Sequence, residues 1–115
     1  MTFTLGVVGA GQFAGQFAEL FRHHPSVSRV FVTDLIAQRA SELMNASSLA
    51  GVHESFDAML ADPAIDAVAI FTQRWTHGPL VVQALRAGKH VYSAVPMAIS
   101  AEEIAAIIDA VRESG

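Results

Sequence analysis

The sequence predicts a doubly wound α/β fold, in which helices cover both faces of a single parallel sheet. Apolar β-like runs alternate with amphipathic helical stretches along all 115 residues, as expected for parallel strands joined by right-handed crossovers. The first run leads directly into a glycine-rich turn. Hydrophobic residues make up 52% of the chain, which fits strands buried on both faces. We expect one domain over residues 1–115, with about five strands in the order 3-2-1-4-5.

The glycine-rich turn lies between a strand expected over residues 3–8 and a helix expected over residues 11–23. Gly9 permits a tight turn, and Gly11 leaves the backbone open to a phosphate. Ala14 supplies the small residue where helix and strand pack closely. The first-turn amides of the helix lack intrahelical partners and form an anion site. The turn therefore predicts a site for a dinucleotide pyrophosphate.

The remaining elements follow from changes in periodicity and from turn residues. We expect them in this order: a strand over 29–34, a helix over 36–45, a strand over 51–53, a helix over 56–60, a strand over 67–71, a helix from about 79 to 87, a strand over 90–93 and a final helix. Gly88 is suited to follow a helix C-terminus. Ser100 and Glu103 form a capping box that opens the final helix.

Two helices carry apolar side chains at helical spacing, which predicts the faces that they bury. In the first helix these side chains are Phe13, Phe17, Leu20 and Phe21. In the final helix they are Ile104, Ile107, Ile108 and Val111.

Asp34 ends the second apolar run and is a further feature of a nucleotide site. A carboxylate at this strand end accepts hydrogen bonds from the ribose hydroxyls of an adenosine. The alternative is that Asp34 caps the following helix. Leu35 and Ile36 bring no positive charge for a 2′-phosphate, and Arg39 lies a helical turn further on. We therefore expect NAD rather than NADP.

The composition excludes several classes of protein. Without cysteine, the chain has no disulfide framework, thiolate metal site or thiol nucleophile. A net charge of −4 and the lack of a basic cluster argue against nucleic-acid binding. No segment approaches the roughly 20 apolar residues of a membrane span, and the first cation is Arg22, unlike the basic start of a signal peptide. We expect a cytoplasmic protein that contacts neither nucleic acid nor membrane.

We also expect no metal site. His23 and His24 are adjacent on a helix, where consecutive side chains diverge. His53 is isolated and expected to be solvated, and Asp62 lies among scattered acidic residues without the spacing of a metal cage.

The second half of the chain contains three motifs: residues 66–72, His77, and an Ala-Gly-Lys-His-Val stretch at 87–91. With these motifs the chain resembles, over its whole length, the Gfo/Idh/MocA oxidoreductase family. The resemblance implies an N-terminal NAD(P)-binding Rossmann domain. Members of this family carry a second α/β domain that holds most of the substrate site, and this chain contains none of it. We therefore expect the chain to be the front domain of a longer protein.

The resemblance also implies which residues contact the cofactor. They are Gly9, Gly11, Gln12, Phe13, Asp34, Thr72, Arg74, Trp75 and His77. The loop motif of the family is Thr-Pro-Asn-x-x-His, and here Gln73 and Arg74 replace its proline and asparagine. Trp75 has two open interpretations, a neighbour of the nicotinamide or an interface aromatic.

The main departure from the family follows the fifth strand. The family has Glu-Lys-Pro there, with the lysine near the nicotinamide, whereas this chain has Ala94-Val95-Pro96. Valine cannot transfer a proton, so the catalytic residues are unknown. The Val95–Pro96 peptide bond can be cis, because the family often builds this turn so.

The expected function of the full-length protein is NAD-dependent hydride transfer to or from a sugar or polyol-like substrate, and we expect a homo-oligomer. This chain alone is expected to be inactive. The alternative is a non-catalytic NAD-binding or sensing protein, which Val95 favours. An S-adenosylmethionine-dependent methyltransferase also combines a glycine turn with an acid after strand two, but the match at 88–91 argues against it.

Overall fold

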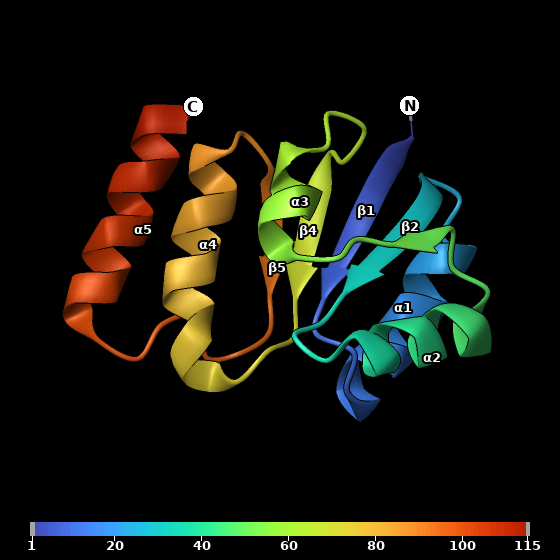
Figure 1. Cartoon of the computed structure of the whole chain (residues 1–115). Coiled ribbons are helices and arrows are strands. Elements are labelled where there is room, and N and C mark those ends of the chain that lie inside the picture. Colours follow the sequence, from blue (N-terminus) through green and yellow to red (C-terminus); the bar gives the residue numbers. More distant parts are fainter. Residues whose placement is uncertain (1, 115) are drawn as a thin grey trace.

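The computed structural model describes residues 2–114 and contains one parallel sheet of five strands. The strands are β1 (Phe3–Val8), β2 (Val27–Thr33), β3 (Gly51–Val52), β4 (Ala67–Ile70) and β5 (His90–Ser93). Their spatial order is β3-β2-β1-β4-β5 (Figure 1). The predicted fold class and strand order are confirmed.

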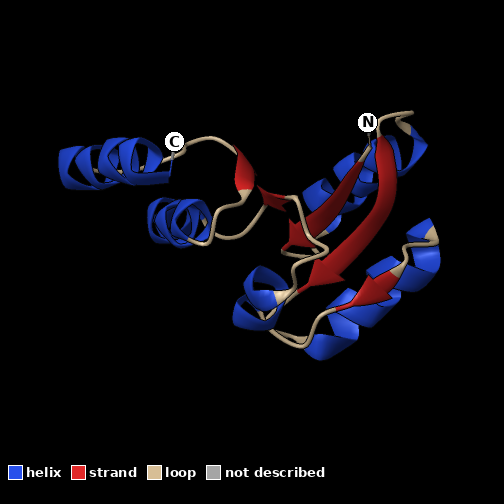
Figure 2. Cartoon of the chain, turned by 90° about the horizontal axis from the view of Figure 1, so that it is seen from above, coloured by secondary structure: helices blue, strands red, loops and turns tan. Residues whose placement is uncertain are grey.

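Five α-helices connect and cover the strands. They are α1 (Gln12–His23), α2 (Ala37–Ser47), α3 (Phe56–Ala61), α4 (His77–Arg86) and α5 (Ala101–Ser114), with a short 3-10 helix η1 (Arg74–Thr76) before α4. Seen from above, helices flank the strands on both sides (Figure 2). None of the helices within residues 2–114 is both long enough and apolar enough to cross a bilayer.

Alternate residues of the buried strands face two separate cores, as the twofold repeat of a strand requires. On one face, Val7 and Val32 pack with residues of α1 and α2. On the other face, Val68 and Ile70 pack with residues of α3, α4 and α5. All four side chains are almost fully buried. The sheet is thus covered on both faces, which explains its continuous apolar strands.

The buried face of α1 differs from the prediction. Ala14 and Ala18 are buried against the sheet, while Phe13 and Leu20 are 58% and 65% exposed. Phe17 and Phe21 are half-buried in an aromatic cluster with Phe71 and Tyr92. Small residues occupy the sheet-facing positions because they let the helix and the strand approach closely.

The buried face of α5 is also narrower than predicted. Ile107 is 6% exposed, whereas Ile104, Ile108 and Val111 are 46–49% exposed. The reason is that α5 packs on α4 and lies outside the sheet (Figures 1 and 2). A helix covered by one neighbouring helix buries a single narrow stripe.

The predicted helix boundaries are largely correct at α4 and α5. Helix α4 starts at His77, two residues before the proline expected to open it, and Gly88 follows its C-terminus with φ +80°. At α5, the Glu103 N–H donates to Ser100 Oγ over 3.1 Å, and Glu103 Oε1 accepts from the Ile99 N–H over 2.9 Å. The capping box is therefore present, with its return bond one residue earlier than usual.

Candidate functional site

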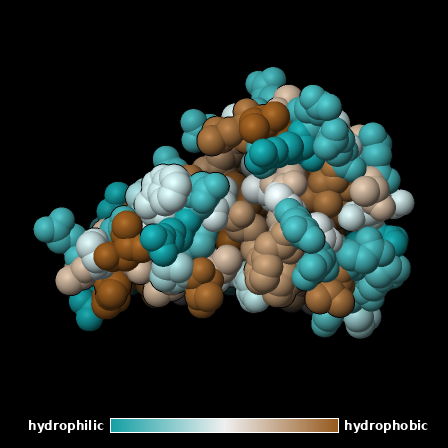
Figure 3. Space-filling view, turned by 90° about the horizontal axis from the view of Figure 1, so that it is seen from below, coloured by the Kyte–Doolittle hydropathy of each residue, from teal (hydrophilic) through white to brown (hydrophobic). Residues whose placement is uncertain are grey.

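The candidate site lies where the carboxyl ends of β1 and β4 meet. The chain leaves β1 toward β2 on one side and returns as β4 on the other, so this is the switch point at which open α/β sheets bind ligands. Figure 3 shows the face that lies lowest in Figure 1, where the strand arrows end, and its surface is hollowed near the middle. Two neighbouring cavities occupy this edge.

The first cavity has a volume of about 580 Å³, which is in the usual range for small-molecule sites. Its walls come from the glycine turn, the β2–α2 and β3–α3 loops and the segment after β4. The lining residues are Val8, Gly9, Ala10, Gly11, Thr33, Asp34, Leu35, Ile36, Arg39, Glu54, Ser55, Phe56, Phe71, Thr72, Gln73, Thr76 and Leu80.

Gly9 and Gly11 perform different tasks in the turn. Gly9 has φ +95°, and a Cβ at this position would lie 2.8 Å from the Phe71 carbonyl oxygen. A side chain is therefore excluded at Gly9 by both conformation and space. A Cβ at Gly11 would have nothing within 4 Å, so that position faces open space in the cavity wall.

The N-terminus of α1 carries the positive end of the helix dipole, and no acidic side chain of the first turn neutralises it. Gly11 is the N-cap residue, no side chain caps the helix, and its first turn contains no acidic residue. The unpaired first-turn amides and the helix dipole both favour an anion. This end of α1 has the properties of a phosphate site.

Asp34 ties the glycine turn to the end of β2. Its Oδ2 accepts from the Ala10 N–H over 2.7 Å, and its Oδ1 accepts from the Ile36 N–H over 2.8 Å. Ile36, not Asp34, is the N-cap residue of α2, so the alternative role as a helix cap is wrong. An ionised carboxylate has about four acceptor positions. Two of them remain for the hydroxyls of a ligand.

The second cavity, of about 350 Å³, adjoins the first and shares Phe71 and Thr72 with it. Its lining residues are Phe13, Phe71, Thr72, Arg74, His77, Ala94 and Val95. Val95 is 91% exposed and precedes a cis peptide bond to Pro96, as anticipated.

His77 clamps the two loops that frame the second cavity. Its ring is 2% exposed; Nδ1 lies 2.6 Å from the Pro96 carbonyl oxygen and Nε2 lies 2.8 Å from the Thr72 carbonyl oxygen. Thr72 Oγ1 in turn bonds Thr76 Oγ1 over 2.6 Å. Neither ring nitrogen is free to exchange a proton with a substrate, so His77 acts here as a positioning residue.

The residues predicted from the sequence divide between these cavities. Gly9, Gly11 and Asp34 line the first, Thr72 lines both, and Phe13, Arg74 and His77 line the second. Gln12 and Trp75 line neither cavity, and Trp75 is 58% exposed.

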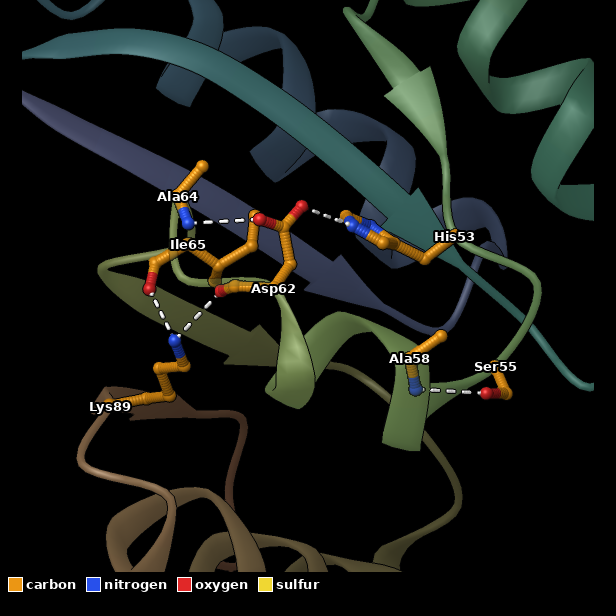
Figure 4. A network of polar contacts seen from close by, with 7 residues as sticks. All are labelled: His53, Ser55, Ala58, Asp62, Ala64, Ile65 and Lys89. Carbon is orange, nitrogen blue, oxygen red and sulfur yellow. Dashed lines mark hydrogen bonds and ion pairs between the residues drawn. The ribbon is translucent and has the colours of Figure 1, made fainter.

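Sequence analysis missed the part of the first cavity that follows β3. Glu54, Ser55 and Phe56 line it, although nothing in their types distinguishes them from an ordinary turn. Their position directly after a strand was the available signal, because every strand of a parallel sheet ends at this edge. Ser55 caps α3 by accepting from the Ala58 N–H over 3.0 Å (Figure 4).

A network of polar contacts holds the segments next to the β3–α3 loop in place. His53 Nε2 lies 2.9 Å from Asp62 Oδ2, and Lys89 Nζ donates to the carbonyl oxygens of Asp62 and Ile65 over 3.0 and 2.7 Å (Figure 4). The His53 side chain is 13% exposed, so its expected solvation is wrong. The hydrogen bond from His53, and a second one from the Ala64 N–H, lower the pKa of Asp62. Among residues 2–114, no three histidine or acidic side chains are grouped to hold a metal ion.

Comparison with known families agrees with this geometry. Residues 3–115 match the model of the Gfo/Idh/MocA family, described as an oxidoreductase family with an NAD-binding Rossmann fold.

Two curated relatives are inositol dehydrogenases. The chain is 32% identical over 110 residues to scyllo-inositol 2-dehydrogenase (NAD(+)) of Bacillus subtilis, covering 95% of this chain and 32% of the relative. It is 34% identical over 112 residues to inositol 2-dehydrogenase of Rubrobacter xylanophilus, covering 96% and 32%. The chain thus spans about a third of the length of these relatives.

Solved structures of similar fold contain either nicotinamide cofactor. GenD2 from gentamicin A biosynthesis, in complex with NAD, superposes with a TM-score of 0.90 at 27% identity, covering 99% of this chain and 32% of that one. Biliverdin reductase from Synechocystis, in complex with biliverdin and NADP+, superposes with a TM-score of 0.89 at 29% identity, covering 98% and 35%.

Proposed function

The chain belongs to the Gfo/Idh/MocA oxidoreductase family, and we propose that it is the cofactor domain of an NAD-dependent dehydrogenase of a sugar, polyol or related hydroxy compound. The observation that carries this proposal is the first cavity, where the uncapped N-terminus of α1 and the carboxylate of Asp34 face one volume of about 580 Å³. An anion site beside a hydroxyl acceptor is what an adenosine diphosphate moiety requires.

The two cavities would hold a dinucleotide in one direction. The first turn of α1 would bind its pyrophosphate, and the free lone pairs of Asp34 would bond its adenosine ribose. The nicotinamide half would then extend past Phe71 and Thr72, which both cavities share, to Phe13, Arg74 and His77. Gln12 and Trp75, which line neither cavity, remain predicted contacts.

NAD is the proposed cofactor, with NADP disfavoured. Asp34 would repel a 2′-phosphate at the position where it accepts ribose hydroxyls. Arg39 lines the same cavity, and its positive charge would attract a 2′-phosphate and so oppose the preference for NAD. The charge of Asp34 outweighs that of Arg39 in this preference, because the Asp34 carboxylate is held at the end of β2 by two backbone N–H groups.

The bound nicotinamide would supply hydride transfer, and the residues of this chain would hold and orient it. Phe13 and Val95 give the second cavity apolar walls. The proton exchanged with the substrate hydroxyl must pass through a group outside this lining, since His77 is clamped and Thr72 is bonded to Thr76. We expect the full-length protein to contain a second domain, as in the longer inositol dehydrogenases. That domain is the proposed source of the proton-transferring group and of most substrate contacts.

A second candidate function is NAD binding without catalysis, as in a sensor. Val95 favours it, because an exposed valine occupies the cavity wall where the family places its lysine. The two candidates predict the same cofactor binding by this chain and differ in hydride exchange by the full-length protein.

The proposal is tested by titrating the chain with NADH, NADPH and S-adenosylmethionine, following the fluorescence of Trp75, its sole tryptophan. We expect saturable binding of NADH, at least about tenfold weaker binding of NADPH, which corresponds to about 1.4 kcal/mol, and none of S-adenosylmethionine. If neither NADH nor NADPH binds, the proposed function is contradicted. Equal binding of the two would contradict only the NAD preference.

A further inference from the structure

The second cavity carries a charge that the fold does not use. Arg74 lines it, and among residues 2–114 the Arg74 guanidinium makes no ion pair or side-chain hydrogen bond. The other lining residues include no carboxylate, and most are apolar. An arginine beside apolar walls and without a partner is suited to pair with an anionic group of a ligand.

The backbone that presents Arg74 is held in place. Arg74 opens the 3-10 helix η1, where the Thr76 N–H donates to the Gln73 carbonyl oxygen over 2.9 Å and Thr76 Oγ1 donates to the same oxygen over 2.6 Å. The His77 N–H donates to the Arg74 carbonyl oxygen, and the clamped ring of His77 follows directly. The base of the side chain is therefore pre-organised at the cavity wall, which limits the entropy lost when it binds a ligand.

His77 does not compete for this role. It is the other lining residue that can carry positive charge, but both of its ring nitrogens face backbone carbonyl oxygens. The charge available to a ligand in this cavity is therefore that of Arg74.

We propose that Arg74 is a specificity-determining residue, which selects a substrate carrying a carboxylate, such as a sugar acid or a hydroxy acid, over a neutral polyol. The proposal rests on the proposed function, since it places the substrate beside the nicotinamide in the second cavity. The planar guanidinium binds both oxygens of a carboxylate, whereas a neutral hydroxyl gains much less from it. The aliphatic stem of Arg74 can still line the nicotinamide subsite, because long cationic side chains separate an apolar stem from a charged head.

D-gluconate and sorbitol provide a matched pair of probes, because they differ only in the carboxylate at one end. Each is titrated into the NADH-saturated chain at constant ionic strength, with Trp75, the sequence neighbour of Arg74, as the reporter. The variants are Arg74→Gln and Arg74→Lys. Arg86→Gln is the matched control, because Arg86 lies at the far end of α4, exposed and paired with Glu113. NADH affinity is measured for every variant.

We expect gluconate to bind the chain more tightly than sorbitol, because this chain supplies the contact from Arg74 and few other substrate contacts. Arg74→Gln should lower the affinity for gluconate at least about tenfold, which is the usual scale for losing a charged hydrogen bond. Arg74→Lys should retain part of the affinity, and Arg86→Gln should match the original chain.

Four results would overturn the proposal. Equal binding of gluconate and sorbitol, or unchanged gluconate affinity in Arg74→Gln, would refute it and leave the proposed function intact if NADH still binds. Loss of NADH binding in Arg74→Gln, with gluconate competing against NADH, would assign Arg74 to the cofactor pyrophosphate instead. Failure of the original chain to bind NADH would remove both proposals together.

Discussion

The two cavities at the carboxyl edge of the sheet are built from different parts of the chain. The polar features of the first come from backbone or are held by it: a glycine turn, unpaired helix amides and a carboxylate that is itself fixed by two backbone N–H groups. The second is shaped by side chains, among them Phe13, Arg74 and Val95. A site made of backbone tolerates sequence change, whereas one made of side chains changes its chemistry with each substitution. Under the proposed function, the first cavity would hold the cofactor, and the side chains of the second would set the chemistry beside it.

The largest expected effect concerns the turn that shapes the first cavity. Gly9→Ala should lower the free energy of unfolding by roughly 3 kcal/mol, since it adds backbone strain at positive φ to a steric clash with backbone. Gly88→Ala is the matched control, because Gly88 has φ +80° but open space around its Cβ position. It should cost about 1 kcal/mol, from strain alone. Urea unfolding of both variants makes the comparison, and equal losses would show that the close approach to Phe71 does not constrain the turn.

The next effect separates binding from folding in the same turn. Gly11→Val places a side chain in the open space of the first cavity, while its φ of −78° and ψ of −176° suit any residue. NADH affinity should fall at least about tenfold, with stability lowered by no more than about 1 kcal/mol, because valine is a poorer N-cap residue than glycine. Titration and urea unfolding of one preparation provide both values. Unchanged NADH affinity would place the pyrophosphate elsewhere.

A smaller effect is expected from the carboxylate that selects the cofactor. Asp34→Asn keeps the shape of the side chain but loses its charge, and its amide nitrogen cannot accept one of the two backbone hydrogen bonds. NADH should therefore bind about fivefold more weakly and NADPH more strongly than before, a change of about 1 kcal/mol for NADH. The exposed Asp109→Asn, on α5, is the charge-matched control. If the ratio of NADH to NADPH affinity stays constant, Asp34 does not set the preference.

The smallest effect tests the network behind the first cavity. The pKa of Asp62 is lowered by its hydrogen bond from His53, so this carboxyl stabilises the fold above its ordinary pKa of 3.8. That contribution is lost as the pH falls below 3.8, through the lowered value. Asp62→Asn should therefore reduce the melting temperature at pH 6, and the difference from the original chain should shrink below pH 4. A difference that is independent of pH would show that the charge of the Asp62 carboxylate contributes nothing.

The sequence predicted the sheet and the first cavity because their signals are local. Gly9 is required by the turn, Gly11 leaves the turn open to a ligand, and Asp34 directly follows the end of a strand. In a parallel sheet, such strand ends always meet at one edge. Gly9, Gly11 and Asp34 were therefore identifiable without knowing any tertiary contact, unlike the ordinary-looking β3–α3 loop.

The errors concern side chains whose burial depends on distant neighbours. Periodicity marked four apolar residues of α5 but could not show that α4 alone would cover that helix. His53 looked isolated because its partner, Asp62, lies across a loop and a helix. The clamp on His77 was equally invisible, since its partners are backbone carbonyl oxygens whose positions follow only from the fold.

The most direct measurement is the amide chemical-shift map of the 15N-labelled chain, 12.2 kDa in mass, with ADP and with NADH. ADP should shift the amides of the first cavity, at Gly9, Gly11 and Ile36. NADH should shift the same amides and also those of the second cavity, at Arg74 and Val95. Shifts confined to other parts of the chain, or identical maps for the two nucleotides, would contradict a dinucleotide lying across both cavities.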